Sequence, residues 1–145
     1  MSRPTAAELE ALVLRLTAVT TRRDGFSRTA AATLSRLATA GPARLTDLAV
    51  AEGVSQPSMS SLIARLVDQG LVRRETDPAD ARAVRLSLTT AGETLVEERR
   101  TDRTRRLDAA LADLPADDVA RIAAALPALT RLADALRRSP KEVSR

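Results

Sequence analysis

The sequence predicts a mainly α-helical fold that carries one small β-hairpin. Helical spacing of apolar residues recurs at both ends of the chain and in its centre, whereas the alternation typical of strands occurs near residues 71–88. The length of 145 residues suits a single domain. We therefore expect one domain over residues 1–145, with a compact central module at residues 27–92 and long helices on either side.

The N-terminal region predicts two helices. The first carries an apolar stripe formed by Leu9, Leu12, Leu16 and Val19. The second spans Ser27 to Ala40 and ends at Gly41-Pro42. Its expected inward residues are Ala31, Leu34, Leu37 and Ala38.

Residues 43–69 predict two short helices that meet at a tight turn. Thr46 is the expected cap of the first helix, and Glu52-Gly53 ends it, because glycine readily adopts the left-handed conformation. Ser55 is a natural N-cap for the second helix, and Pro57 is tolerated in a first turn. The second helix carries an apolar stripe of Met59, Leu62, Ile63, Leu66 and Val67.

The opposite face of the second helix is small and polar. Its residues are Pro57, Ser58, Ser60, Ser61, Ala64 and Arg65. Small side chains allow a helix to lie deep in a DNA major groove, where Ser, Gln and Arg reach phosphates or base edges. An ordinary solvent-facing surface helix would show the same pattern.

A predicted hairpin follows this helix. Gly70 ends the helix, residues 71–76 read as a short strand, and residues 77–82 are rich in turn formers. Val84, Leu86 and Leu88 then alternate with Arg85 and Ser87, as in a half-buried strand. A helix-turn-helix followed by a basic hairpin is the order of a winged helix-turn-helix.

These residues resemble the MarR family of bacterial transcription regulators. The resemblance is carried by Ser55, Ser58-Met59-Ser60, Leu66, Gly70-Leu71-Val72, Arg74, Asp77-Pro78, Asp80-x-Arg82 and Leu86-x-Leu88-Thr89-x-x-Gly92. It implies that the helix from Ser55 to Gln69 enters the major groove. It also implies that Arg82 enters the minor groove and that Asp80 orients this arginine. Ala81 stands where many members carry a second basic residue.

On this basis the expected DNA-binding residues come from the second helix and the hairpin. They are Ser55, Gln56, Pro57, Ser58, Ser60, Ser61, Arg65, Arg73, Arg74, Asp80 and Arg82.

The resemblance also implies a homodimer built from the terminal helices, residues 1–26 and 93–145. Thr90-x-x-Glu93 predicts a capping box at the start of a helix that runs to about Leu114, and Pro127 is expected to kink the last helix. The expected interface residues are Leu9, Leu12, Leu16, Val119, Ile122, Leu126, Leu129 and Leu136. Periodicity alone leaves an intrachain core as an alternative for this surface.

Members of the family often bind a small, frequently aromatic molecule that releases DNA. By resemblance, the pocket would be lined by Leu12, Leu16, Phe26, Ala30, Leu34 and Leu95. An ordinary core explains these residues better than a ligand pocket does. Phe26 is the one aromatic residue of the sequence, which gives little support to ring stacking on a ligand.

The charge distribution is compatible with a polyanionic partner without identifying one. The formal net charge is +4, but residues 44–92 contain six arginines and six acids. The acids of this module must therefore lie away from any DNA-binding face. The polar stretch Glu97–Arg106 carries five arginines and reads as a solvated connecting helix, with phosphate binding as an alternative.

Composition argues against catalysis. The sequence has no histidine and no cysteine, which excludes Ser-His-Asp and Cys-His chemistry, disulfides and the commonest metal ligands. The paired acids Asp117-Asp118 and Glu97-Glu98 fit helix-dipole compensation and solvation. We expect no enzyme activity, cofactor or metal.

We expect a cytoplasmic regulator, because no long apolar run or signal-like start occurs. Its expected partners are double-stranded DNA with a pseudo-palindromic operator, a second copy of the chain and a small-molecule effector, with no membrane. An alternative is a winged-helix module that contacts proteins, such as an anti-regulator without DNA affinity. Asp80-x-Arg82 argues against this alternative, because it has no obvious purpose without DNA.

Overall fold

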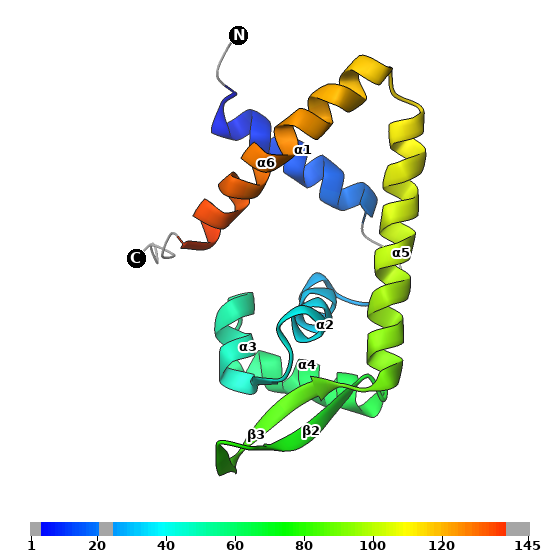
Figure 1. Cartoon of the computed structure of the whole chain (residues 1–145). Coiled ribbons are helices and arrows are strands. Elements are labelled where there is room, and N and C mark those ends of the chain that lie inside the picture. Colours follow the sequence, from blue (N-terminus) through cyan, green and yellow to red (C-terminus); the bar gives the residue numbers. More distant parts are fainter. Residues whose placement is uncertain (1–3, 21–24, 139–145) are drawn as a thin grey trace. The chain divides into compact units, whose positions relative to one another are not determined.

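The computed structural model describes residues 4–20 and 25–138 and confirms the mainly helical fold with a small sheet (Figure 1). The chain divides into two compact units, residues 1–104 and residues 105–145. The elements in chain order are α1 (Ala6–Thr20), α2 (Arg28–Ala40), β1 (Ala43–Arg44), α3 (Leu45–Glu52), α4 (Gln56–Asp68), β2 (Val72–Asp77), β3 (Asp80–Leu88), α5 (Thr90–Ala112) and α6 (Ala116–Arg138).

Helices α2, α3 and α4 form the helical part of the central module. Ser27 caps α2 by accepting a hydrogen bond from the Ala30 N–H at 3.1 Å. Helix α3 ends at Gly53, whose φ of 65° lies in the left-handed region and turns the chain toward α4. The predicted helix-turn-helix is therefore present between Leu45 and Asp68.

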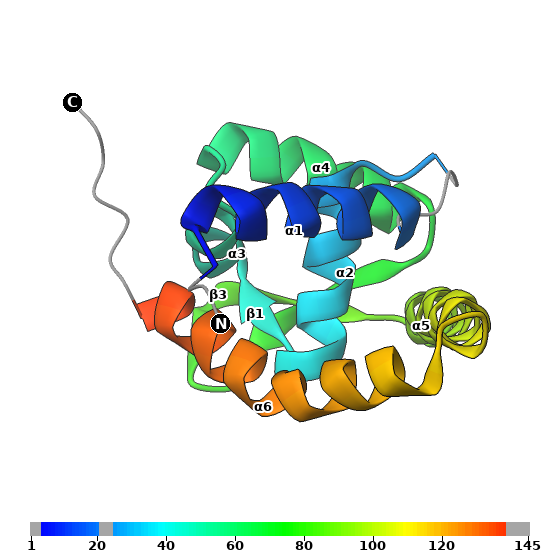
Figure 2. The same cartoon turned by 90° about the horizontal axis from the view of Figure 1, so that it is seen from above.

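The sheet has three antiparallel strands in the order β1-β3-β2. Leu86 of β3 pairs with Ala43 on one side and with Arg74 on the other. Figure 2 shows β1 beside β3, next to α2 and α3. The β2–β3 hairpin is long and its far end extends beyond the helices (Figure 1). This hairpin is the wing.

One hydrophobic core joins the helices to the base of the wing. Leu34, Leu48 and Ile63 are at most 1% exposed. Phe26, Leu95 and Val96 pack against this core, so the first turns of α5 belong to the same unit. The buried apolar residues are Ala30, Leu34, Leu37, Leu48, Ala49, Met59, Leu62, Ile63, Leu66, Val72, Leu86 and Leu88.

Two expected caps are wrong by one or two residues. Arg44, not Thr46, occupies the N-cap of α3 and makes no side-chain capping bond. At the start of α5, the Thr89 hydroxyl accepts the Gly92 N–H at 3.1 Å, so Thr89 takes the place expected for Thr90. In both cases strand pairing or the wing base decides where the helix begins.

Three expectations for inward-facing positions also need correction. Ala38 is exposed, because the buried face of α2 is centred on Ala30, Leu34 and Leu37. Val84 is 51% exposed because it lies on the part of β3 that extends beyond the helices, whereas Ser87 is buried near its base.

The wing turn is tighter than expected. Turn formers fill residues 77–82, but β2 extends to Asp77 and β3 begins at Asp80. The Asp77 carboxylate accepts the Ala79 N–H at 2.9 Å, which closes the turn over two residues.

Helices α1 and α6 carry exposed apolar residues. In α1, Leu12 and Leu16 are each 48% exposed, and the side chain of Val19 lies outside the described residues. In α6, Leu126 is 55% exposed, and the helix continues through Pro127.

Candidate nucleic-acid interface

Helix α4 presents one buried and one exposed face. Met59, Leu62, Ile63 and Leu66 are buried and Val67 is partly buried against the same core, which confirms the predicted apolar stripe. The expected DNA-facing residues of this helix are all exposed: Ser55, Gln56, Pro57, Ser58, Ser60, Ser61 and Arg65. The polar face of α4 is therefore solvent-exposed along the helix.

The first turn of α4 is organised by two serines. The Ser55 hydroxyl accepts the Ser58 N–H at 3.2 Å and donates to the Ser58 hydroxyl at 2.8 Å. Pro57 occupies the first turn, where its missing N–H costs no helical bond. The start of this helix, at the positive end of the helix dipole, is thus exposed and capped by its own serine.

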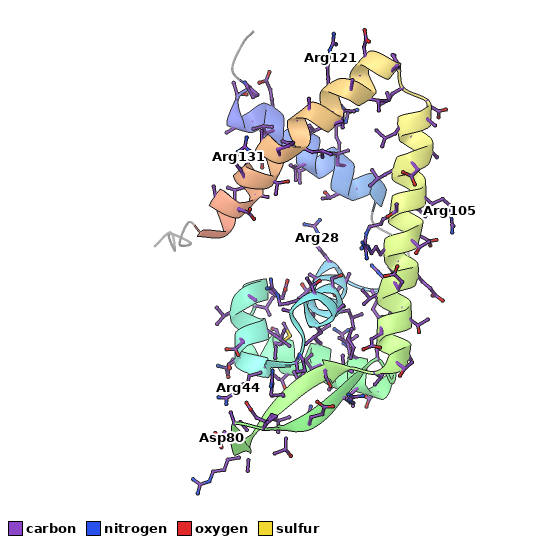
Figure 3. All side chains as sticks on the ribbon, in the orientation of Figure 1. Arg28, Arg44, Asp80, Arg105, Arg121 and Arg131 are labelled. Atoms are coloured by element: carbon purple, nitrogen blue, oxygen red, sulfur yellow. The ribbon has the colours of Figure 1, made fainter. Side chains whose placement is uncertain are left out.

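The wing holds Arg82 close to its tip. Asp80 accepts the Arg82 backbone N–H at 3.0 Å through Oδ1, so it acts on the main chain of Arg82. Asp80 is seen at the end of the hairpin in Figure 3. Among the residues that the structure describes, exposed Arg65, Arg74 and Arg82 form no ion pair.

Arg73 has a different environment from Arg74. Neighbouring residues of a strand point to opposite faces of the sheet. Arg73 lies on the face that carries Glu75, and its Nε donates to the Glu75 carboxylate at 2.5 Å. Arg74 pairs in register with buried Leu86. The two expected DNA-binding arginines of β2 therefore do not share one face.

Arginines neutralise half of the acids in the central module. Glu52 pairs with Arg36 of α2 at 2.8 Å, and Glu75 pairs with Arg73. Asp77 pairs with Arg44. The pairs of Glu75 and Asp77 lie within residues 44–92 and leave the formal charge balance of this segment unchanged, whereas Arg36 lies outside it and neutralises Glu52. Arg65, Arg74 and Arg82 remain as exposed positive charges.

The Arg44–Asp77 ion pair connects the start of α3 to the wing turn. Arg44 Nε and Nη2 donate to Asp77 Oδ2 at 2.9 and 2.8 Å. The pKa of Asp77 lies below its ordinary value, first because its carboxylate accepts the Ala79 N–H and second because Arg44 donates to it. Local sequence spacing does not predict this pair, because its partners are 33 residues apart.

The environment of Arg99 also differs from the one that the sequence predicts. This arginine was expected on a solvated helix, yet it is 6% exposed and its guanidinium lies 5.5 Å from the Phe26 ring centre. This distance fits a cation–π contact, which explains how an arginine of this polar helix becomes buried.

The expected effector-pocket residues do not form one lining. Ala30 and Leu34 belong to the closed core, and Phe26 and Leu95 pack against it. Phe26 and Ala30 also border a small hollow of about 100 Å³ together with Arg65 and Gln69. Leu12 and Leu16 do not border this hollow.

In the part of the chain that the structure describes, no group of three or more acids, histidines or cysteines is placed to hold a metal ion. No described helix is long and apolar enough to cross a membrane.

A helix-turn-helix with an exposed polar second helix and a basic hairpin beside it defines a winged helix-turn-helix protein of the DNA-binding class. Comparison with known proteins supports the same class. The sequence model of the MarR family matches residues 26–84. The uncharacterised HTH-type transcriptional regulator ML2140 of Mycobacterium leprae is 37% identical over 126 residues, which cover 83% of this chain and 88% of that protein.

Solved structures show the same fold. A mutant of MarR from E. coli superimposes with a TM-score of 0.75 at 20% identity and covers 90% of this chain and 98% of its own. MepR of S. aureus bound to ethidium bromide superimposes with a TM-score of 0.61 at 21% identity. The match covers 92% of this chain and 97% of the MepR chain. The chain belongs to the MarR family of transcriptional regulators and is a DNA-binding regulator rather than an enzyme.

Proposed function

We propose that two copies of this chain bind a pseudo-palindromic operator and repress the gene that encodes it or neighbouring genes. In this proposal, residues 27–92 bind DNA, and residues 1–26 and 93–145 join the two copies. The observation that carries the proposal is the exposed polar face of α4 in the same module as a wing with unpaired Arg82.

The assignment of contacts follows from exposure and chemistry. Ser58, Ser61 and Arg65 offer hydroxyl and guanidinium donors along one face of α4, which suits the major groove. Arg82 offers an unpaired guanidinium near the wing tip, which suits the narrow, negatively charged minor groove. Two such modules read two half-sites when the copies are related by twofold symmetry.

A dimer is supported by the apolar residues that α1 and α6 expose. Leu12, Leu16, Leu126 and Leu129 are each at least 45% exposed. Exposed apolar residues repeated along a helix are typical of an interface between chains. A second copy would remove this surface from water.

The test is fluorescence anisotropy with a labelled duplex from upstream of the encoding gene. We expect specific binding that weakens steeply as salt increases. Arg82→Ala should weaken binding by roughly fivefold to a hundredfold, the range typical of a specific arginine contact. Arg28→Ala is the matched control, because it removes an exposed positive charge from α2.

Two results would overturn the proposal. Absence of duplex binding at low salt would favour a protein-contact module instead. Equal losses for Arg82→Ala and Arg28→Ala would show that the wing supplies only general positive charge.

We also propose that a small molecule releases the DNA by binding near Phe26 and Ala30. The hollow at these residues touches Arg65 of α4 and Gln69, which follows the end of this helix, so an occupant there would press on the DNA-reading helix. Its volume of about 100 Å³ is below the roughly 300 Å³ of common ligand sites, so binding requires the hollow to open. The ethidium complex of MepR makes planar cations sensible first probes.

Adding ethidium or an aromatic carboxylate to the preformed DNA complex should lower the anisotropy. The same compounds should raise the unfolding temperature of the protein without DNA. Release without stabilisation of the free protein would indicate that the compound acts on the DNA.

A further inference from the structure

The wing is attached to the helix-turn-helix by side chains as well as by the sheet. Strand β1 contributes two residues, Ala43 and Arg44, which pair with Leu86 and Arg85 of β3. So short a ladder by itself gives little control over the far end of a long hairpin.

Two arginines strengthen this attachment. Arg85 of β3 donates through Nη2 to the Pro42 carbonyl at 2.8 Å. Arg44, immediately before α3, donates twice to Asp77 at the end of β2. Asp77 is 6% exposed, so its carboxylate is largely shielded from competing water. Figure 3 shows Arg44 beside the hairpin and Asp80 at its tip.

Asp77 connects this attachment to the wing turn. Its Oδ1 accepts the Ala79 N–H, while its Oδ2 accepts from Arg44. Asp77 also pairs in register with Asp80, whose carboxylate accepts the Arg82 N–H. A continuous series of hydrogen bonds and strand pairs therefore runs from the start of α3 to the backbone of Arg82.

We propose that the Arg44–Asp77 contact sets the position of the wing relative to the helix-turn-helix, so that Arg82 meets the minor groove while α4 occupies the major groove. Arg44 and Asp77 are thus positioning residues for DNA binding. The inference rests on the proposed contact between Arg82 and DNA. Simultaneous binding in two grooves requires a preset spacing, because a loose wing loses entropy when it is ordered on DNA.

Asp77→Asn separates this role from simple charge effects. Asparagine keeps an oxygen that accepts the Ala79 N–H, but it removes the charged acceptor of Arg44. Loss of a negative charge near DNA strengthens binding by electrostatics alone. The proposal predicts the opposite sign, a loss of affinity of roughly threefold to thirtyfold, as is typical of coupled contacts. Glu75→Gln is the matched control, since it removes a carboxylate from the same strand without touching Arg44; its affinity should not fall.

A double-mutant cycle shows whether the effect passes through Arg82. Affinities are measured for the full chain, Asp77→Asn, Arg82→Ala and the double variant, all well below their unfolding temperatures. We expect Asp77→Asn to weaken binding in the full chain and to have almost no further effect beside Arg82→Ala. Arg44→Lys, which keeps one charged donor, should retain more affinity than Arg44→Gln.

Each contrary outcome has a distinct meaning. If Asp77→Asn leaves affinity unchanged or raises it while Arg82→Ala weakens binding, the positioning role is wrong and the proposed wing contact stands. An equal loss in the presence and absence of Arg82 shows that Asp77 acts elsewhere, which also overturns the inference. If Arg82→Ala matches its Arg28→Ala control, the proposed wing contact itself fails.

Discussion

Gly92 shows at the scale of one residue how the base of the wing is built. The Thr89 hydroxyl donates to the Gly70 carbonyl at 2.5 Å and accepts the Gly92 N–H at 3.1 Å. A Cβ on Gly92 would lie 2.1 Å from the Leu71 carbonyl oxygen. The spacing of Thr89 and Gly92, which marked the family in the sequence, therefore has a steric and hydrogen-bonding cause.

Gly92→Ala should lower the free energy of unfolding by about 1–3 kcal/mol, because backbone at Leu71 has to shift to admit the methyl group. Urea unfolding followed by circular dichroism measures the change. Ala91→Ser, at the exposed position before it, is the control and should change stability by less than about 0.5 kcal/mol. Equal effects of the two substitutions would contradict the close approach.

The Asp77 carboxylate predicts a pH dependence of stability. Its pKa in the folded protein lies below its ordinary value of 3.8, so the ionised form stabilises the fold above that pH. This contribution is lost as the pH falls below 3.8 and through the folded pKa. Asp77→Asn should therefore be less stable than the unaltered chain near neutral pH, and the difference should shrink in acid.

Urea titrations from about pH 7 to about pH 3 test this sign. Glu75 also has a lowered pKa, mainly through its hydrogen bond with Arg73, and it remains in both proteins. Its contribution cancels when the two unfolding curves are compared. A stability difference that stays constant down to the lowest pH would contradict the role of Asp77.

At the scale of elements, α4 is specified almost entirely by its own residues. Ser55 caps it, Pro57 suits its first turn, and its apolar stripe is buried as spacing predicts. The wing differs, because its turn is closed by Asp77 and its second strand begins at Asp80. The turn formers in the sequence predict that the chain reverses here. They do not predict how many residues the turn contains.

Ser55→Ala should lower the free energy of unfolding by about 1 kcal/mol, because the Ser58 N–H loses its capping acceptor. Ser60→Ala is the control on the same helix, at an exposed interior position where alanine favours helix formation. Thermal unfolding monitored by circular dichroism distinguishes the two. A larger loss for Ser60→Ala would show that the cap is unimportant.

At the scale of the whole molecule, the apolar residues of α1 and α6 matter most. The central module closes its own core, whereas α1 and α6 leave leucines exposed in a single chain. Periodicity in the sequence left an intrachain core and a dimer interface open for these helices. The proposed dimer requires that these leucines be buried between two copies.

Leu126→Asp should convert a dimer to a monomer and weaken operator binding, because a charge would be buried between the copies. Ala124→Asp places the same side chain on the opposite side of α6 and should leave the dimer intact. Sedimentation velocity gives the mass of each variant, and anisotropy gives its affinity for the duplex. An unchanged mass for Leu126→Asp would exclude this residue from the interface.

Local sequence was sufficient for the winged helix-turn-helix and for the buried stripe of α4, because caps, turns and periodicity act over a few residues. The motif from Asp80 to Gly92 was sufficient for the family. Tertiary structure alone decided which charges are neutralised: Glu52 by Arg36 and Asp77 by Arg44. These partners meet only after the helices and the wing pack together, since pairing across 16 and 33 residues depends on packing geometry rather than on sequence spacing.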